Sequence, residues 1–71
     1  MNTKILQRIG KQIKYLRNRV NMTQEVLAEK IGVHQTYIGK IESGKSNPSA
    51  LLLYRISRAL GVELKELFDF E

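Results

Sequence analysis

The chain has 71 residues, a net charge of +5 and no cysteine, which excludes disulfides and thiolate metal sites. Its length is enough for one domain spanning residues 1–71, and the single histidine, His34, excludes a metal cage built from several histidines. No apolar run approaches the roughly 18 residues of a membrane span, and no apolar stretch follows the N-terminus. We therefore expect a small cytoplasmic protein without a membrane segment, a signal peptide, a metal ion or a cofactor.

Apolar residues recur at spacings of three and four in the first segment: Ile5, Ile9, Ile13, Leu16 and Val20. This spacing predicts one helix with an apolar stripe and with its basic residues on the other faces. Residues 1–22 hold six bases and no acid, whereas residues 62–71 hold one base against Glu63, Glu66, Asp69 and Glu71. A chain with one cationic end can orient itself on a polyanion, although an ordinary basic surface stays an open alternative.

The second predicted helix runs from Thr23, an acceptable N-cap, to Gly32, which can take the positive φ of a tight turn. Glu25 favours the positive end of this helix. Its inward side chains are Leu27, Ala28 and Ile31. Because Ala28 is small and lies four residues before Gly32, it permits the next helix to cross closely.

Three more helices are predicted after Gly32. The third runs from about His34 to Ser43, with Ile38 and Ile41 pointing inward. The fourth begins near Ser49 and ends before Gly61. It buries Leu53, Ile56, Ala59 and Leu60. The last is short, about 63–68, and Leu64, Leu67 and Phe68 are expected to close the core. No segment alternates with period two, so the predicted fold class is all-α, a compact five-helix bundle.

Two stretches of the sequence carry a resemblance to a known family. They are "MTQEVLAEKIGVHQTYIGKIESGKSNPS" and "ISRALGVELKELF", and the match extends upstream through "IGKQIKYLRNR". The chain resembles the lambda-repressor-like, Cro-type helix-turn-helix family, also called the XRE family, over nearly its whole length. The resemblance implies a five-helix bundle in which helices 2 and 3, from about Thr23 to Glu42, form a helix-turn-helix that binds double-stranded DNA.

The third helix has a polar face suited to base contacts in a major groove, which is about 12 Å wide and admits an α-helix. Thr36 lies opposite the buried side, with Gly39 and Lys40 beside it and Gln35 at one margin. Glutamine can pair with adenine, lysine can donate to guanine, and the threonine methyl can contact thymine. Gly39 lowers helix propensity by about 1 kcal/mol relative to alanine, and a close approach to DNA is one reason to tolerate it. An ordinary solvated face is the alternative.

His34 departs from the family pattern, which commonly has Ser, Thr or Asp at that position as the cap of the recognition helix. Histidine caps poorly, so the sequence leaves the start of this helix open. A base contact by His34 and a surface histidine without a role are both open interpretations.

Phosphate contacts are predicted on both sides of the groove. Gln24 opens the second helix, where free backbone amides and the helix dipole favour an anion, and the resemblance implies that this glutamine holds a phosphate. The other candidates are Tyr37, Ser43, Lys45, Ser46 and Asn47. The resemblance also implies a structural pair between Arg17 and Glu42, and the alternative is an exposed pair worth only about 0–1 kcal/mol.

The sequence also contains surplus apolar residues. Val26, Leu51 and Leu52 stand where the family more often has polar residues. The predicted dimer patch consists of Leu51, Tyr54, Phe68 and Phe70. Because a single recognition helix contacts few bases, we expect a homodimer on a palindromic operator. Scattered surface residues without a role are the alternative.

The predicted function is sequence-specific transcriptional regulation, without enzymatic activity or an evident small-molecule effector. No arrangement of nucleophile, base and oxyanion donors is indicated. The rival is an antitoxin or another interaction module whose main partner is a protein. Such a module should carry apolar anchors on the third helix, and this face is polar. RNA is disfavoured because the deep, narrow groove of an A-form duplex does not admit a helix.

Overall fold

Every predicted helix is present in the computed structural model, which describes residues 3–70, but the last one is a 3-10 helix. In chain order the elements are α1 (Thr3–Arg19), α2 (Gln24–Ile31), α3 (Gln35–Glu42), α4 (Ala50–Leu60) and η1 (Leu64–Phe68). The all-α class is confirmed, and the five predicted helices are four α-helices and one 3-10 helix among the described residues. Of the charged residues considered above, Glu71 lies outside the described part of the chain.

The residues predicted to cap the second and fourth helices do so in the structure. The Thr23 hydroxyl accepts a hydrogen bond from the backbone N–H of Val26 at 3.1 Å, and the Ser49 hydroxyl accepts one from Leu52 at 3.1 Å. Each bond satisfies one backbone donor that the first turn of a helix leaves without a partner. At the other end of α2, Gly32 adopts the left-handed conformation with φ 71°, which only glycine takes without strain.

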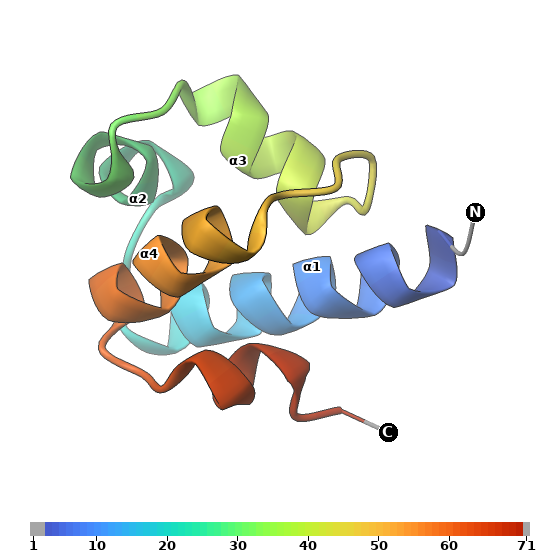
Figure 1. The fold of residues 1–71 in the computed structure, drawn as a ribbon. Helices are drawn as coiled ribbons and strands as arrows, with labels where there is room; N and C mark the ends of the chain where they lie inside the picture. Colours follow the sequence, from blue (N-terminus) through green and yellow to red (C-terminus); the bar gives the residue numbers. More distant parts are fainter. Residues whose placement is uncertain (1–2, 71) are drawn as a thin grey trace.

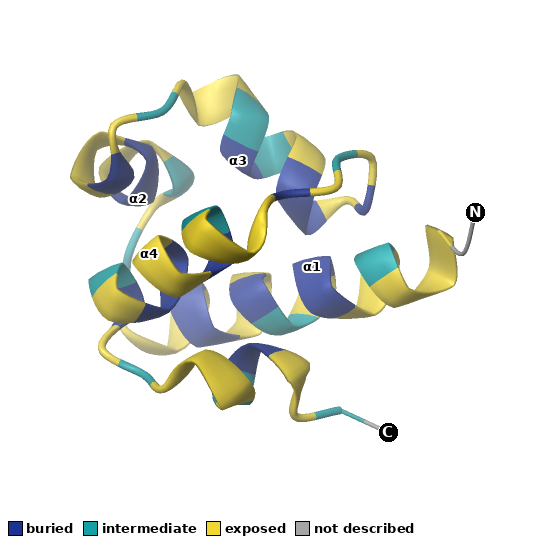
Figure 2. Ribbon diagram, in the orientation of Figure 1, coloured by how far each residue is buried: buried dark blue, intermediate teal, exposed yellow. Residues whose placement is uncertain are grey.

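The core lies where α1, α2, α3 and α4 converge, and η1 covers it on the side of α1 and α4 (Figure 1). Figure 2 shows the buried positions on the sides of the helices that face the centre of the molecule. The buried apolar side chains are Ile9, Ile13, Leu16, Leu27, Ala28, Ile31, Ile38, Ile41, Leu53, Ile56, Leu60 and Leu67. This core fixes how α2 and α3 are held against α1, and therefore fixes the position of the polar face of α3.

The prediction that the two end residues of the first apolar stripe point inward is wrong. Ile5 and Val20 are 41% and 44% exposed. Ile5 lies in the first turns of α1, which has 17 residues and extends past the much shorter α3, and Val20 follows Arg19, the last residue of the helix. The middle of the stripe, with Ile9, Ile13 and Leu16, is buried as predicted.

The last segment also departs from its prediction. Leu67 is completely buried, but Leu64 and Phe68 are exposed and do not close the core. In an α-helix, positions 64, 67 and 68 would share one face. In a 3-10 helix only positions three apart are aligned, so Phe68 is turned away from Leu67 and toward solvent. Leu64 is aligned with Leu67 but lies at the first position of η1 and stays partly exposed.

Candidate nucleic-acid interface

The turn between α2 and α3 brings two short helices together at a sharp angle. Gly32 ends α2, and the backbone N–H of Val33 donates to the carbonyl of Ala28 at 3.0 Å. Ala28 itself is 3% exposed, so its small side chain lies inside the junction as the sequence predicts. These contacts form the helix-turn-helix geometry in which α3 can project from the body of the protein.

His34 is the N-cap of α3, which corrects the expectation that histidine would cap poorly and leave the helix start undefined. Its ring Nδ1 accepts a hydrogen bond from the backbone N–H of Thr36 at 3.3 Å, and the helix begins at Gln35. The imidazole nitrogen therefore takes the part that a serine or aspartate oxygen plays in other caps. The His34 side chain is exposed at the N-terminal end of α3.

The two sides of α3 differ completely in burial. Ile38 and Ile41 are 1% and 2% exposed, and they hold the helix against the core. The candidates for base contacts lie on the other side, where Gln35, Thr36 and Lys40 are exposed. No hydrogen bond or ion pair within residues 3–70 involves the side chains of these three residues. Their donors and acceptors are therefore available to another molecule.

A buried polar network fixes the C-terminal end of α3. The Arg17 guanidinium donates from Nε to Glu42 Oε2 at 2.6 Å and from Nη2 to Glu42 Oε1 at 3.0 Å. Its third nitrogen, Nη1, donates to the carbonyl of Met22 at 2.7 Å. Gln24 adds a bond from its amide Nε2 to Glu42 Oε1 at 3.0 Å. The carboxylate of Glu42 and the guanidinium of Arg17 together join α1, the α1–α2 link, α2 and α3.

Arg17 and Glu42 form a buried pair, so the alternative of an exposed surface pair is wrong. The two side chains are only 8% and 3% exposed. A two-pronged guanidinium–carboxylate contact fixes direction as well as distance, because both N–H groups must align with both oxygens. The network therefore holds α3 in one orientation relative to α1 and α2.

Gly10 is a structural residue that sequence reasoning missed. A Cβ at this position would lie 2.5 Å from the carbonyl oxygen of Glu42 and closer still to that of Ile41. Its absence lets α1 pass directly against the last turn of α3. A glycine inside a helix is unfavourable by about 1 kcal/mol relative to alanine, and this cost was the available signal of a packing role.

Gln24 and Gly39 are brought together at the junction of α2 and α3. Gln24 is half-buried because its amide is bound to Glu42. A Cβ on Gly39 would lie 3.8 Å from Gln24 Oε1, which is an ordinary van der Waals contact. The protein therefore has room for a methyl group at position 39, and its own packing does not require a glycine there.

The remaining phosphate candidates lie in and beside the loop after α3. Ser43 is the C-cap of α3, and its hydroxyl donates to the carbonyl of Lys40 at 3.1 Å. Lys45 and Asn47 are exposed, and Ser46 is half-buried. This loop and the start of α1 line a shared cleft. Tyr37 lies within α3, is half-buried and packs against the core.

The predicted dimer patch is only partly available. Leu51 is 69% exposed, and Tyr54 and Phe68 are about half exposed at 49% and 44%. Phe70 instead packs against the core, and the Arg8 guanidinium carbon lies 5.9 Å from the centre of its ring. Leu52 is also half-buried against the core. Phe70 and Leu52 are therefore less available to a second copy than Leu51, Tyr54 and Phe68.

Other classes of site receive no support from the described residues. Between residues 3 and 70, no group of three or more His, Cys, Asp or Glu residues could hold a metal ion. No helix in the same range is long and apolar enough to cross a membrane.

Comparisons with known proteins agree with this geometry. Residues 13–67 match a family model described as helix-turn-helix. The chain is 42% identical over 60 residues to an uncharacterized HTH-type transcriptional regulator of Archaeoglobus fulgidus, a match that covers 84% of each protein.

Two solved structures are similar over most of their length. The first is the restriction-modification controller protein C.AhdI of Aeromonas hydrophila, with 33% identity, a TM-score of 0.86 and coverage of 89% of this chain and 96% of the controller. The second is SinR, a master regulator for biofilm formation solved in complex with DNA, with 37% identity, a TM-score of 0.78 and coverage of 86% and 98%.

Proposed function

This chain belongs to the helix-turn-helix family of DNA-binding transcriptional regulators, and we propose that it places α3 in the major groove of specific operators as a dimer. The observation that supports this mechanism is the division of α3. One side is fixed in the core by Ile38 and Ile41, and the other presents polar groups with no partner among residues 3–70. Family membership also means that the chain is a regulator and not an enzyme.

Base recognition is assigned to the exposed side of α3. Gln35 offers an adjacent acceptor and donor that match the N6 and N7 edge of adenine. Lys40 can donate to O6 or N7 of guanine, and the Thr36 methyl can contact the methyl of thymine. His34 lies at the leading end of the helix, and Gly39 allows a close approach between helix and bases.

Phosphate contacts are assigned to residues on either side of the groove. Gln24 lies at the N-terminus of α2, where the helix dipole favours an anion. The loop after α3 contacts the phosphates of the DNA backbone through Ser43, Lys45, Ser46 and Asn47. The hydroxyl of Tyr37 contacts a phosphate as well. These contacts hold the protein on the duplex without distinguishing between bases.

Dimerisation on a palindrome is proposed through the exposed apolar residues of α4 and η1. Leu51, Tyr54 and Phe68 supply this patch, since Phe70 is occupied within the fold. Two copies would then place their recognition helices in successive major grooves, about 34 Å apart. The whole molecule acts as one DNA-binding domain in this proposal.

Titration of duplex DNA at several salt concentrations tests the proposed contacts. Each neutralised phosphate contributes about −0.9 to the slope of log affinity against log salt. Lys45→Ala should weaken binding to all sequences alike and reduce the magnitude of the slope by about 0.9. Lys65→Ala, a matched change at an exposed lysine on η1, should leave the slope unchanged. Absence of binding at low salt, or equal slopes for wild type and Lys45→Ala, contradicts the assignment.

A further inference from the structure

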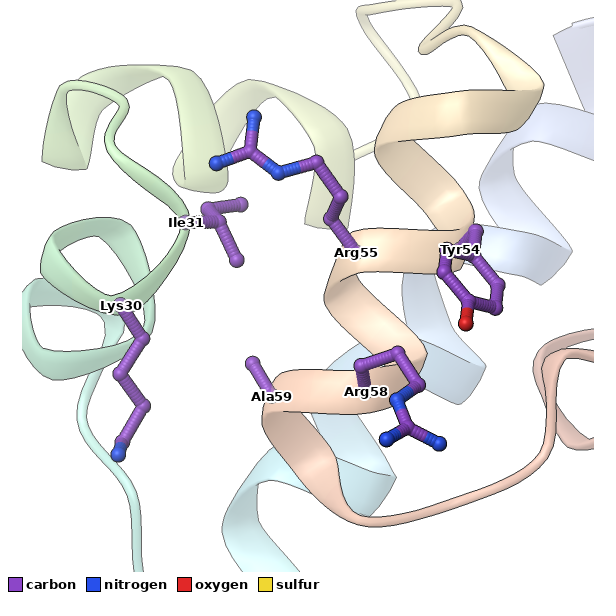
Figure 3. A pocket seen from close by; sticks show the side chains of 6 residues that line it. All are labelled: Lys30, Ile31, Tyr54, Arg55, Arg58 and Ala59. Carbon is purple, nitrogen blue, oxygen red and sulfur yellow. The ribbon is translucent and has the colours of Figure 1, made fainter.

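A cationic groove lies between α2 and α4, outside the proposed DNA-binding surface (Figure 3). It is lined by Lys30, Ile31, Tyr54, Arg55, Arg58 and Ala59. Its three charged residues are all positive. Within residues 3–70, no ion pair joins Lys30, Arg55 or Arg58 to an acidic side chain.

An acidic surface lies on the other side of α4. The segment that follows α4 carries Glu63, Glu66 and Asp69 against a single base, Lys65. Arg58 lines both the cationic groove and a second cleft, which Glu63 and Glu66 also line. In Figure 1, α4 lies between α2 and η1, and it packs against both of them. The exposed ridge of α4 therefore separates a positive surface from a negative one.

We propose that the groove receives the acidic 3-10 helix of a second copy of this chain, in a dimer whose two-fold axis runs along the ridge of α4. This inference rests on the dimer of the proposed function and gives it a geometry. A two-fold interface uses the same surface twice, so each copy must present both halves of the contact. The positive groove and the negative segment are two such halves, placed side by side.

The charges distinguish between two orientations of the symmetry axis. An axis along α4 exchanges the two sides of the ridge, so the groove of one copy faces η1 of the other. An axis across α4 instead brings groove against groove, where Lys30, Arg55 and Arg58 would repel their own counterparts. Like charges placed opposite each other at an interface lower the affinity by about a hundredfold or more. The charges therefore favour the axis along α4.

The same axis is required for two copies to contact one duplex. The helix α4 begins at Ala50, directly after the loop of proposed phosphate contacts that follows α3. A two-fold axis along α4 places both loops at the same end of the dimer. An axis across α4 would place them at opposite ends, where one operator could not reach both. Charge complementarity and DNA geometry thus select the same arrangement.

The ridge itself supplies the apolar centre of this interface. Leu51, Tyr54 and Arg58 are spaced three and four residues apart, so they share one side of α4. Leu51 is 69% exposed and Tyr54 is 49% exposed. Interfaces generally place apolar and aromatic residues at the centre and charged residues at the rim. Here the rim charges would decide the orientation of the two copies.

Charge reversal with mixing tests the inference in the free protein. One chain carries Arg55→Glu and Arg58→Glu, and the other carries Glu63→Lys and Asp69→Lys. Sedimentation equilibrium should show self-association of each chain alone weakened by about tenfold or more, because both contacts of its homodimer become repulsive. An equimolar mixture should associate like wild type, since both contacts of the heterodimer are attractive again. Circular dichroism checks that each chain is folded.

A matched control separates the groove from total charge. Lys11→Glu with Lys14→Glu changes the net charge by the same amount and in the same direction as Arg55→Glu with Arg58→Glu, but on the exposed face of α1, and it should leave self-association unchanged. Wild-type association should also weaken between about 0.1 M and about 1 M salt, where the screening length falls from about 10 Å to about 3 Å.

The possible failures can be told apart. A wild-type dimer whose association is unaffected by either reversal, or a mixture that associates no better than its separate chains, overturns the groove contact alone. A wild-type chain that binds a palindrome with one copy at saturation overturns the proposed dimer and this inference with it. DNA binding by α3 would stand in either case, because a single half-site duplex measures it independently.

Discussion

The inner and outer sides of α3 differ in how their polar groups are used. On the inner side, the carboxylate of Glu42 receives hydrogen bonds from Arg17 and Gln24 and is almost completely buried. On the outer side, Gln35, Thr36 and Lys40 are exposed, and none of their side chains is bonded within residues 3–70. A helix of 8 residues therefore combines a fully partnered side with an unpartnered one.

This difference separates orientation from recognition. The inner side fixes the direction of α3 relative to α1 and α2, while the outer side can change without disturbing the fold. Substitutions on the inner side should therefore act mainly on the free energy of unfolding. Substitutions on the outer side should act mainly on the affinity for DNA and on base preference.

Glu42→Ala should have the largest effect on stability. It removes the acceptor of the network and leaves the Arg17 guanidinium buried without its counter-charge. Breaking a buried ion pair in this way lowers the free energy of unfolding by about 3–5 kcal/mol, which urea denaturation measures. The double variant Arg17→Met, Glu42→Leu should recover much of that loss, because no uncompensated charge remains. A loss below about 1 kcal/mol for Glu42→Ala would show that the network does not hold α3.

Gly10→Ala should have the next largest effect. The added methyl group would collide with the backbone carbonyls of Ile41 and Glu42, so α1 and α3 must move apart. Overpacking of this kind typically lowers the free energy of unfolding by about 1–3 kcal/mol, and backbone atoms can yield little. Thermal and urea denaturation should both show the loss. A variant as stable as wild type would mean that α1 does not need this close approach.

Gly39→Ala is the matched substitution on the other side of α3, and its expected effect is smaller and opposite in sign. The methyl group meets Gln24 only at van der Waals distance, and alanine is the better helix former. The free energy of unfolding should rise by up to about 1 kcal/mol. Affinity for operator DNA should fall, because the methyl group enters the space that the bases approach. A stabilised variant with unchanged DNA affinity would place Gly39 away from the contact.

The sequence was sufficient to predict the helices and most of the core. Local chemistry decides these features: Thr23 and Ser49 cap their helices as expected, and the apolar spacing identifies Ile9, Ile13 and Leu16 as buried. Spacing does not say where a helix ends or how far it extends past its neighbours, so Ile5 and Val20 were placed inside although they are exposed. How much of a helix its neighbours cover is a tertiary property, and the periodicity of the sequence does not specify it.

The candidate site was predictable by position but not by contact. The resemblance supplied the pairing of Arg17 with Glu42, whereas the bond from Gln24 to the same carboxylate depends on how α2 and α3 cross. The cap formed by His34 was missed because an imidazole nitrogen is a rare substitute for an oxygen acceptor. Phe70 packs against the core because of the path that the chain takes after η1, and no local pattern specifies this path.

The most direct test of the account is selection of bound sequences from a pool of random duplexes. We expect the wild-type chain to enrich one motif. Gln35→Ala and Lys40→Ala should each lose preference at one or two positions of that motif, by about 1–3 kcal/mol per position, with stability unchanged. Lys45→Ala should enrich the same motif as wild type, with lower affinity throughout. If both α3 variants retained the full wild-type preference while Lys45→Ala altered it, the assignment of base recognition to the outer side of α3 would be wrong.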